Sequence, residues 1–152
     1  MGTFQQLYEN LKDLLDEVTD IQDKHMSPTF SFNGFPGAFL VPSGNEADFL
    51  TTNDNQRIYA FKVWIFVEYD ETQKKTAYLD LVNCVDQLLN KIDEQENPDV
   101  SERSMAHGMG AGVTLLAVLA TPSRFALDEE TKLLGAEVTV RCKTTVDLTL
   151  LT

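Results

Sequence analysis

Residues 57–69, RIYAFKVWIFVEY, constrain the fold of this chain more than any other segment. β-branched and aromatic residues, which favour strands, dominate the segment. One side of the strand would carry Tyr59, Phe61, Val63, Ile65, Val67 and Tyr69. The other side is also largely apolar and would carry Ile58, Ala60, Lys62, Trp64, Phe66 and Glu68. Because a strand that is apolar on both sides is covered on both sides, we predict a central strand whose second cover is a helix or another subunit.

Two later segments also have the pattern of strands. Residues 113–120, VTLLAVLA, are almost continuously apolar, and residues 136–150 alternate between the two sides of a strand. The apolar side of the second segment would carry Val138, Val140, Cys142, Thr144, Val146 and Leu148. Its polar side would carry Glu137, Arg141, Lys143, Thr145 and Asp147. We predict that these segments and residues 57–69 form one mostly antiparallel sheet, with residues 121–134 as a long, protruding connection.

Two segments have the apolar periodicity of amphipathic helices. Residues 3–24 would form the first helix, with Thr3 as its N-cap, and residues 72–92 the second, with Thr72 as its N-cap. The apolar stripe of the second helix consists of Tyr78, Leu81, Val82, Val85, Leu88, Leu89 and Ile92. Together the patterns predict an α+β fold, a mostly antiparallel sheet with two amphipathic helices packed on one face.

Residues 29–56 have a different pattern, which predicts a short edge strand followed by a long polar loop. The apolar run from Ala38 to Val41 suits a short edge strand, and Pro42-Ser43-Gly44 would stop it. The polar segment 45–56 is longer than an ordinary turn, and loops of that length usually carry function or contact a partner.

Composition excludes several classes of protein. The chain of 152 residues suits a single domain, 1–152, with long protruding loops. A formal net charge of -12 argues against binding nucleic acid through its phosphates and against docking on an anionic membrane. The N-terminal residues lack the pattern of a signal peptide, and two cysteines are too few for a disulfide scaffold, so we expect a protein made in a reducing cytoplasm.

The sequence offers little for catalysis or metal binding. Cys84 and Cys142 are expected to be small buried hydrophobes. The acidic residues Asp93, Glu94, Glu96 and Asp99 suit a solvated loop better than a calcium site. We therefore predict no catalytic residue, no metal and no cofactor. Two alternatives stay open, a small enzyme that uses Cys84 with His25 or His107, and an acidic module that shields a basic partner.

The order of these segments resembles the tail terminator, or tail completion, proteins of phages with long non-contractile tails. The resemblance rests on the first helix, the run from Phe35 to Val41, residues 45–67, the second helix around LVNCVDQLL, and the closing strand GAEVTVRC. It implies an α+β protein without enzyme activity that forms a hexameric ring on the tail tube, ends its polymerisation and presents a surface to the head–tail connector or neck protein.

The resemblance also implies where the protein acts and what it touches. The ring would lie at the head-proximal end of the tail in the virion, and DNA would pass through its channel without specific binding. A related neck or head-completion protein, or a tail tube protein, is the alternative. From position and residue type, we expect these subunit or tube contacts: Asn45, Asp48, Phe49, Asn53, Asp54, Trp64, Phe66, Arg124, Arg141 and Lys143. For Trp64, burial under a helix is an equally good interpretation.

Overall fold

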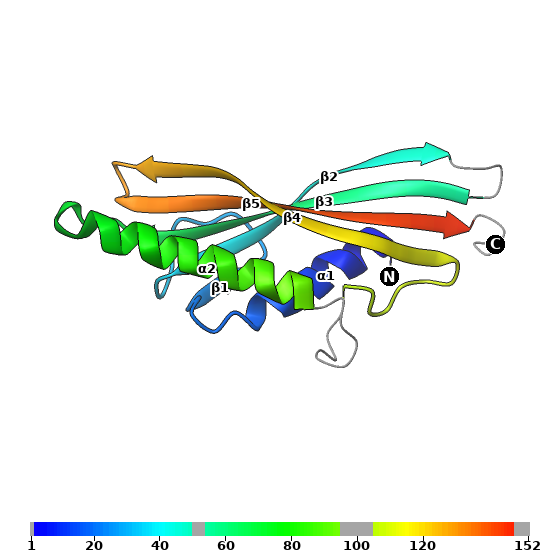
Figure 1. Cartoon of the computed structure of the whole chain (residues 1–152), viewed down its shortest axis with the longest axis horizontal. Helices are drawn as coiled ribbons and strands as arrows, with labels where there is room; N and C mark the ends of the chain where they lie inside the picture. Colours follow the sequence, from blue (N-terminus) through cyan, green and yellow to red (C-terminus); the bar gives the residue numbers. More distant parts are fainter. Residues whose placement is uncertain (1, 50–53, 95–104, 148–152) are drawn as a thin grey trace.

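A computed structural model describes residues 2–49, 54–94 and 105–147 of the chain. Two α-helices, one short 3₁₀ helix and five strands make up this part (Figure 1). In chain order they are α1 (Thr3–Asp16), β1 (Asp23–His25), β2 (Gly37–Phe49), β3 (Asp54–Glu68), η1 (Glu71–Gln73), α2 (Lys74–Glu94), β4 (Val113–Asp128) and β5 (Leu133–Asp147). The fold class is α+β, as predicted.

All five strands belong to one sheet, in the order β1-β2-β3-β5-β4. The short β1 runs parallel to β2, and every other neighbouring pair is antiparallel. The predicted central strand is confirmed, because β3 pairs with β2 on one side and with β5 on the other. The sheet is therefore mostly antiparallel, with β4 along one edge.

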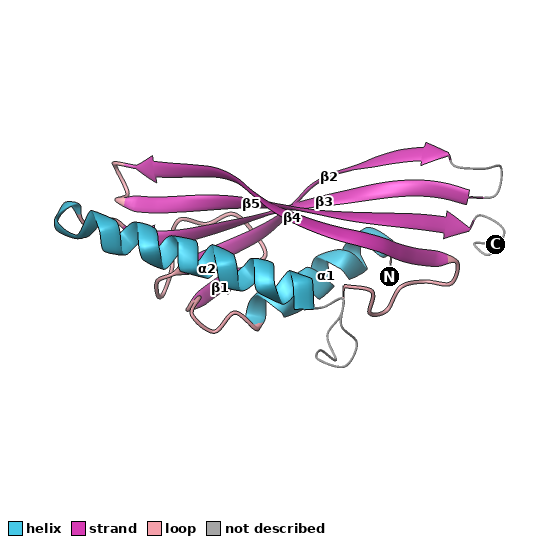
Figure 2. Ribbon diagram, in the orientation of Figure 1, coloured by secondary structure: helices cyan, strands magenta, loops and turns pink. Residues whose placement is uncertain are grey.

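Both α-helices lie on the same side of the sheet (Figure 2). The core fills the space between them and the strands, and it uses the predicted alternation of β3 and β5. On the helices, the core residues include Leu7, Leu11, Leu14, Leu15, Leu81, Val85, Leu88 and Ile92. On β3 and β5 they include Tyr59, Phe61, Val63, Ile65, Val138, Val140 and Cys142. Among the described residues, no helix is long and apolar enough to cross a membrane.

The helix boundaries differ from the prediction. The first helix ends at Asp16, and the buried Val18 and Ile21 follow it in a turn. This turn brings the chain back so that Gln22 N donates to Pro36 O over 2.7 Å, which places β1 beside β2. Thr3 is the first helical residue, and the N-cap is Gly2.

At the second helix, the predicted N-cap is also wrong. The Asp70 side chain accepts a hydrogen bond from Thr72 N and caps η1, and α2 continues from Lys74. Hydrogen bonds from the Thr72 backbone N–H and then from its hydroxyl lower the pKa of this carboxyl, and the smaller effect of desolvation opposes them. The cap of this helical segment therefore lies two residues before the predicted N-cap, at Asp70.

The second strand is longer than predicted. Pro42 and Gly44 do not stop it, because a β-bulge between them absorbs the irregularity. Residues Asn45–Phe49 then pair with β3 from Asn45↔Tyr59 to Phe49↔Asn55. The predicted polar loop 45–56 is thus wrong for the residues that pair, while residues 50–53 lie outside the described part. Backbone pairing with β3 extends a strand whose own sequence is too polar to predict it.

The predicted protruding connection at 121–134 is also wrong. Strand β4 continues to Asp128, with bulges at Leu115/Ala117 and Pro122/Arg124, and only a turn joins it to β5. Pro122 is tolerated because β4 lies at the edge of the sheet, where a missing N–H costs no ladder hydrogen bond. In the turn, Asp128 Oδ1 accepts from Glu130 N, and Lys132 has a φ of 57°.

Candidate interaction surface on the open face of the sheet

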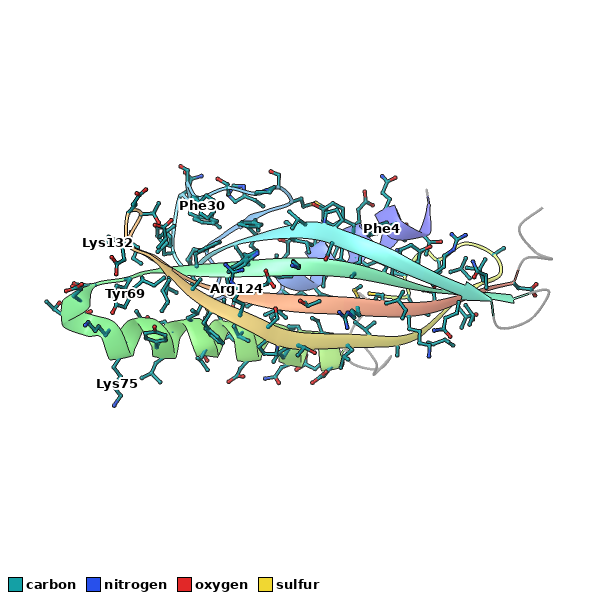
Figure 3. The ribbon with its side chains drawn as sticks, turned by 90° about the horizontal axis from the view of Figure 1, so that it is seen from above. Phe4, Phe30, Tyr69, Lys75, Arg124 and Lys132 are labelled. Atoms are coloured by element: carbon teal, nitrogen blue, oxygen red, sulfur yellow. The ribbon has the colours of Figure 1, made fainter. Side chains whose placement is uncertain are left out.

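The side of β3, β5 and β4 that faces away from the helices is here called the open face. No helix of the described chain covers it (Figures 1 and 2). Figure 3 views the sheet from above, with Arg124 near the middle and Phe30, Tyr69 and Lys132 toward one end. The polar side of β5, predicted from its alternation, belongs to this face and includes Glu137, Arg141 and Lys143.

One end of the open face is aromatic. Phe39, Phe66 and Leu133 are buried there, and Phe32, Phe35, Val41 and Trp64 pack against them. The ring centroids of Trp64 and Phe66 are 5.9 Å apart with the rings stacked, and Phe30 stands edge-on to Phe66 at 5.6 Å. The segment before β2 therefore supplies the cover of this end, which is neither of the two covers expected for β3. Trp64 does not lie under a helix.

Arg124 lies over the Trp64 ring, and an ion pair lies on the neighbouring positions of β3 and β5. The guanidinium carbon of Arg124 lies 5.5 Å from the ring centroid, a cation–π arrangement. The Lys62 Nζ is 3.6 Å from Glu137 Oε1, and Ser123 Oγ donates to the same oxygen over 3.0 Å. Glu137 is only 8% exposed. Lys62 and Ser123 therefore bind a carboxylate that is almost buried in the open face.

Most of the charge along the middle of the open face is positive. The register pairs Arg124 with Glu137, and Arg141 and Lys143 follow on the same side of β5. Both are exposed, as is Arg124. We call Lys62, Arg124, Arg141 and Lys143 the basic strip. Glu137 is the acidic residue among them, while Glu68 and Asp128 lie toward one end of the sheet and Asp147 lies at the other end of β5.

Three pockets adjoin this face. A pocket of about 520 Å³ is lined by Phe30, Phe39, Trp64, Phe66 and Arg124, together with the end of β4 and Leu133. A second pocket of about 450 Å³ is lined by Phe30 together with Phe32, Tyr69 and Lys132. A third, of about 180 Å³, is lined by Leu119, Thr121, Ser123, Thr139 and Arg141. Phe30, 61% exposed, lines both of the first two pockets.

The structure brings together only part of the predicted contact set. Trp64, Phe66 and Arg124 meet at the largest of these pockets, and Arg141 and Lys143 lie farther along the same face. Asn45, Asp48, Phe49 and Asp54 lie in the paired ends of β2 and β3, and Asn53 is outside the described residues. Sequence reasoning missed Phe30 and Leu119. Leu119 lies on the open face by the two-residue alternation of β4. The bulges at Leu115/Ala117 and Pro122/Arg124 interrupt this alternation, so the sequence does not show which side Leu119 faces.

The outer side of α2 holds a second exposed apolar surface. The predicted apolar stripe of this helix is too wide, because Tyr78 and Val82 are 45% and 42% exposed. Leu79 is 58% exposed beside them. The α2 residues that are buried in the core form a narrower stripe: Ala77, Leu81, Cys84, Val85, Leu88 and Ile92. The remaining apolar side chains lie on the helix side of the molecule, away from the open face.

The thiols have the surroundings of structural side chains. Burial first, then the charges of Asp20 and Asp80, raises the pKa of Cys84 to about 11. Burial raises the pKa of Cys142 to about 12. Both were predicted to be buried, and both are. A thiol of such high pKa is a poor nucleophile near neutral pH, and His25 Nε2 is engaged with Asp23 Oδ2 at 2.8 Å.

No metal site emerges from the described residues, which contain no cluster of three or more His, Cys, Asp or Glu side chains suited to an ion. Of the acidic run considered for calcium, Asp93 and Glu94 end α2. Glu96 and Asp99 lie outside the described part of the chain.

Comparison with known proteins gives little beyond this geometry. No family model matches the chain, and no curated protein matches it. Among solved structures, the chain is similar to a chain of the "Virion of native gene transfer agent (GTA) particle", with 12% sequence identity over 91% of each chain. The TM-score is 0.38. Because a score this low does not establish a shared fold, we base the functional proposal on the residues of the chain itself.

Proposed function

We propose that this chain is a structural virion protein that assembles into a ring, a hexamer, which caps the tail tube of a long-tailed phage. The ring ends polymerisation of the tube protein and offers its other surface to the connector or neck protein. DNA passes through the channel without specific binding. The proposal assigns the ring to the head-proximal end of the tail and assigns no reaction to the chain.

The observation that carries the proposal is the sheet with helices on one side only. A strand such as β3, apolar on both sides, needs cover on both, and the segment before β2 covers only the aromatic end. Leu119 and the basic strip remain accessible on the rest of the open face, and Trp64 is half-buried where the aromatic end meets the strip. Aromatic residues and arginine are enriched in the cores of protein interfaces, so this face suits a subunit contact.

Electron microscopy of particles that lack this chain tests the proposal. Tails much longer than normal would support a tube terminator, because nothing would then stop polymerisation. Capsids accompanied by normal, unattached tails would instead identify a neck or head-completion protein. Normal, infectious particles would rule out both functions. Adding the purified chain to tail tubes in vitro is the matching control, since a terminator should bind tube ends and restore the normal length.

A further inference from the structure

We propose that the outer side of α2 of one copy covers the open face of the next copy, in a head-to-tail contact between the basic strip and an acidic, apolar strip of α2. We define the helix strip as Leu79, Val82, Asp86 and Asp93. This inference rests on the proposed ring and names the surfaces that would build it.

The helix strip is continuous because of helical spacing. Leu79, Val82 and Asp86 follow the i, i+3, i+7 pattern, and Asp93 lies two turns beyond Asp86, so the four share one side of the helix. All four are exposed. Lys75 precedes Leu79 by one turn and is the cation on this side (Figure 3). Toward the middle and end of the helix the strip is therefore apolar and acidic.

The two surfaces complement each other in polarity and charge. The open face combines the apolar Trp64 and Leu119 with the cations Arg124, Arg141 and Lys143. The helix strip combines exposed Leu79 and Val82 with two carboxylates. Complementary potentials across an interface favour the correct partner, and like charges opposed to each other exclude wrong ones.

The same charges argue against a two-fold contact. Two open faces packed together through their basic strips would oppose cation to cation, and two helix strips would oppose carboxylate to carboxylate. The surfaces also lie on opposite sides of the sheet, so one copy cannot use both toward the same neighbour. A contact of two different surfaces is heterologous, and such contacts produce closed rings when the rotation between copies closes.

Charge reversal tests this contact on the full-length protein. The sheet variant is Arg141→Glu with Lys143→Glu, and the helix variant is Asp86→Lys with Asp93→Lys. Self-association of each is measured by sedimentation velocity over a concentration series. We expect each variant alone to associate at least about tenfold more weakly than the wild type, because like charges then face each other.

An equimolar mixture of the two variants should recover association. In alternating copies, the acidic sheet meets the basic helix, and the unchanged sheet meets the unchanged helix. The matched control is Glu9→Lys with Asp13→Lys on α1, which changes the net charge as much as the helix variant does and should associate like the wild type. If a reversal variant fails to fold, as judged by thermal melting, the neutral pairs Arg141→Gln/Lys143→Gln and Asp86→Asn/Asp93→Asn replace it.

Three results would overturn the inference: a wild type that stays monomeric at every concentration, reversal variants that associate as tightly as the wild type, or a mixture that stays dissociated. Failure of the proposed function has a different signature. Normal tails in particles without the chain would remove the capping function while leaving the mixing result intact.

Discussion

A single buried amide ties the start of the chain to the segment before β4. Asn10 lies inside α1 and is 3% exposed. Its Nδ2 donates to Met105 O over 2.9 Å and to His107 O over 2.7 Å, and its Oδ1 accepts from Gln6 Nε2. Replacing it by leucine leaves two carbonyl groups without this donor, so we expect Asn10→Leu to lower the free energy of unfolding by about 2–3 kcal/mol in urea titrations.

The control is another side-chain amide on a helix. Asn83 is exposed, and its Nδ2 donates to Asp20 Oδ2 over 3.2 Å. Because water can replace this partner, Asn83→Leu should change stability by no more than about 0.5 kcal/mol. Equal losses in the two variants would show that burial of the Asn10 hydrogen bonds does not matter.

The raised pKa values of the two cysteines predict how the stability of the protein depends on pH. Folding raises their pKa from 9.0 to about 11 for Cys84 and about 12 for Cys142. For a group whose pKa is raised on folding, the stabilising contribution is complete below the unfolded pKa and is lost as pH rises through the folded value. We therefore expect stability to fall above pH 9 more steeply in the wild type than in Cys84→Ala/Cys142→Ala, measured by urea titration at a series of pH values.

A thiol reagent gives the direct check at neutral pH. Neither cysteine should react in the native protein, and both should react once denaturant is added, since each is buried. Rapid labelling of Cys84 in the native state would mean that its side of α2 is accessible and would revive the possibility of a nucleophilic thiol.

At the scale of elements, alternation in the sequence was enough to predict β3 and β5 but not their neighbours. Both strands carry a regular apolar side that the helices bury, and that side was predicted correctly. The far halves of β2 and β4 were not predictable, because they contain bulges at Pro42/Gly44 and Pro122/Arg124 and few apolar residues. These halves are strands because the backbone of a central strand lies beside them, a tertiary effect that local propensity does not contain.

Close packing between β3 and β5 makes Gly135 essential to the aromatic end of the open face. A Cβ at this position would lie 2.7 Å from Phe66 Cε1 and 3.4 Å from Trp64 Cε3. We expect Gly135→Ala to displace the Phe66 ring and to cost about 1–3 kcal/mol. Trp64 is the sole tryptophan, so its fluorescence spectrum should shift in the folded variant.

Gly110→Ala is the control for this packing. An added Cβ there has Val113 Cγ2 at 4.0 Å as its contact. The variant should keep the wild-type fluorescence spectrum and lose little stability. A Gly135→Ala protein with an unchanged spectrum would contradict the packing described for Trp64 and Phe66.

At the scale of the whole molecule, the negative charge is distributed unevenly. The acids of residues 9–23 and Asp86 and Asp93 belong to the helix side, while the basic strip lies on the open face. Lys62, Arg124 and Arg141 are far apart in the sequence, and only the order β3-β5-β4 brings them onto one surface. The sequence could identify Trp64, Arg124 and Arg141 one by one as contact candidates, but it could not show that they lie together or that α2 has a complementary strip.

A head-to-tail assembly is sensitive to subunits that can make only one of the two contacts. The variant Arg141→Glu/Lys143→Glu keeps its helix strip, so it can cover the open face of a wild-type copy, but its own open face repels the next helix strip. Added to the wild type, it should end each growing chain and prevent ring closure. We expect mass photometry to show closed rings replaced by shorter oligomers as the variant fraction rises. The α1 control Glu9→Lys/Asp13→Lys should join the rings without shortening them, whereas rings that persist unchanged beside monomeric Arg141→Glu/Lys143→Glu would mean that the helix strip does not bind the open face.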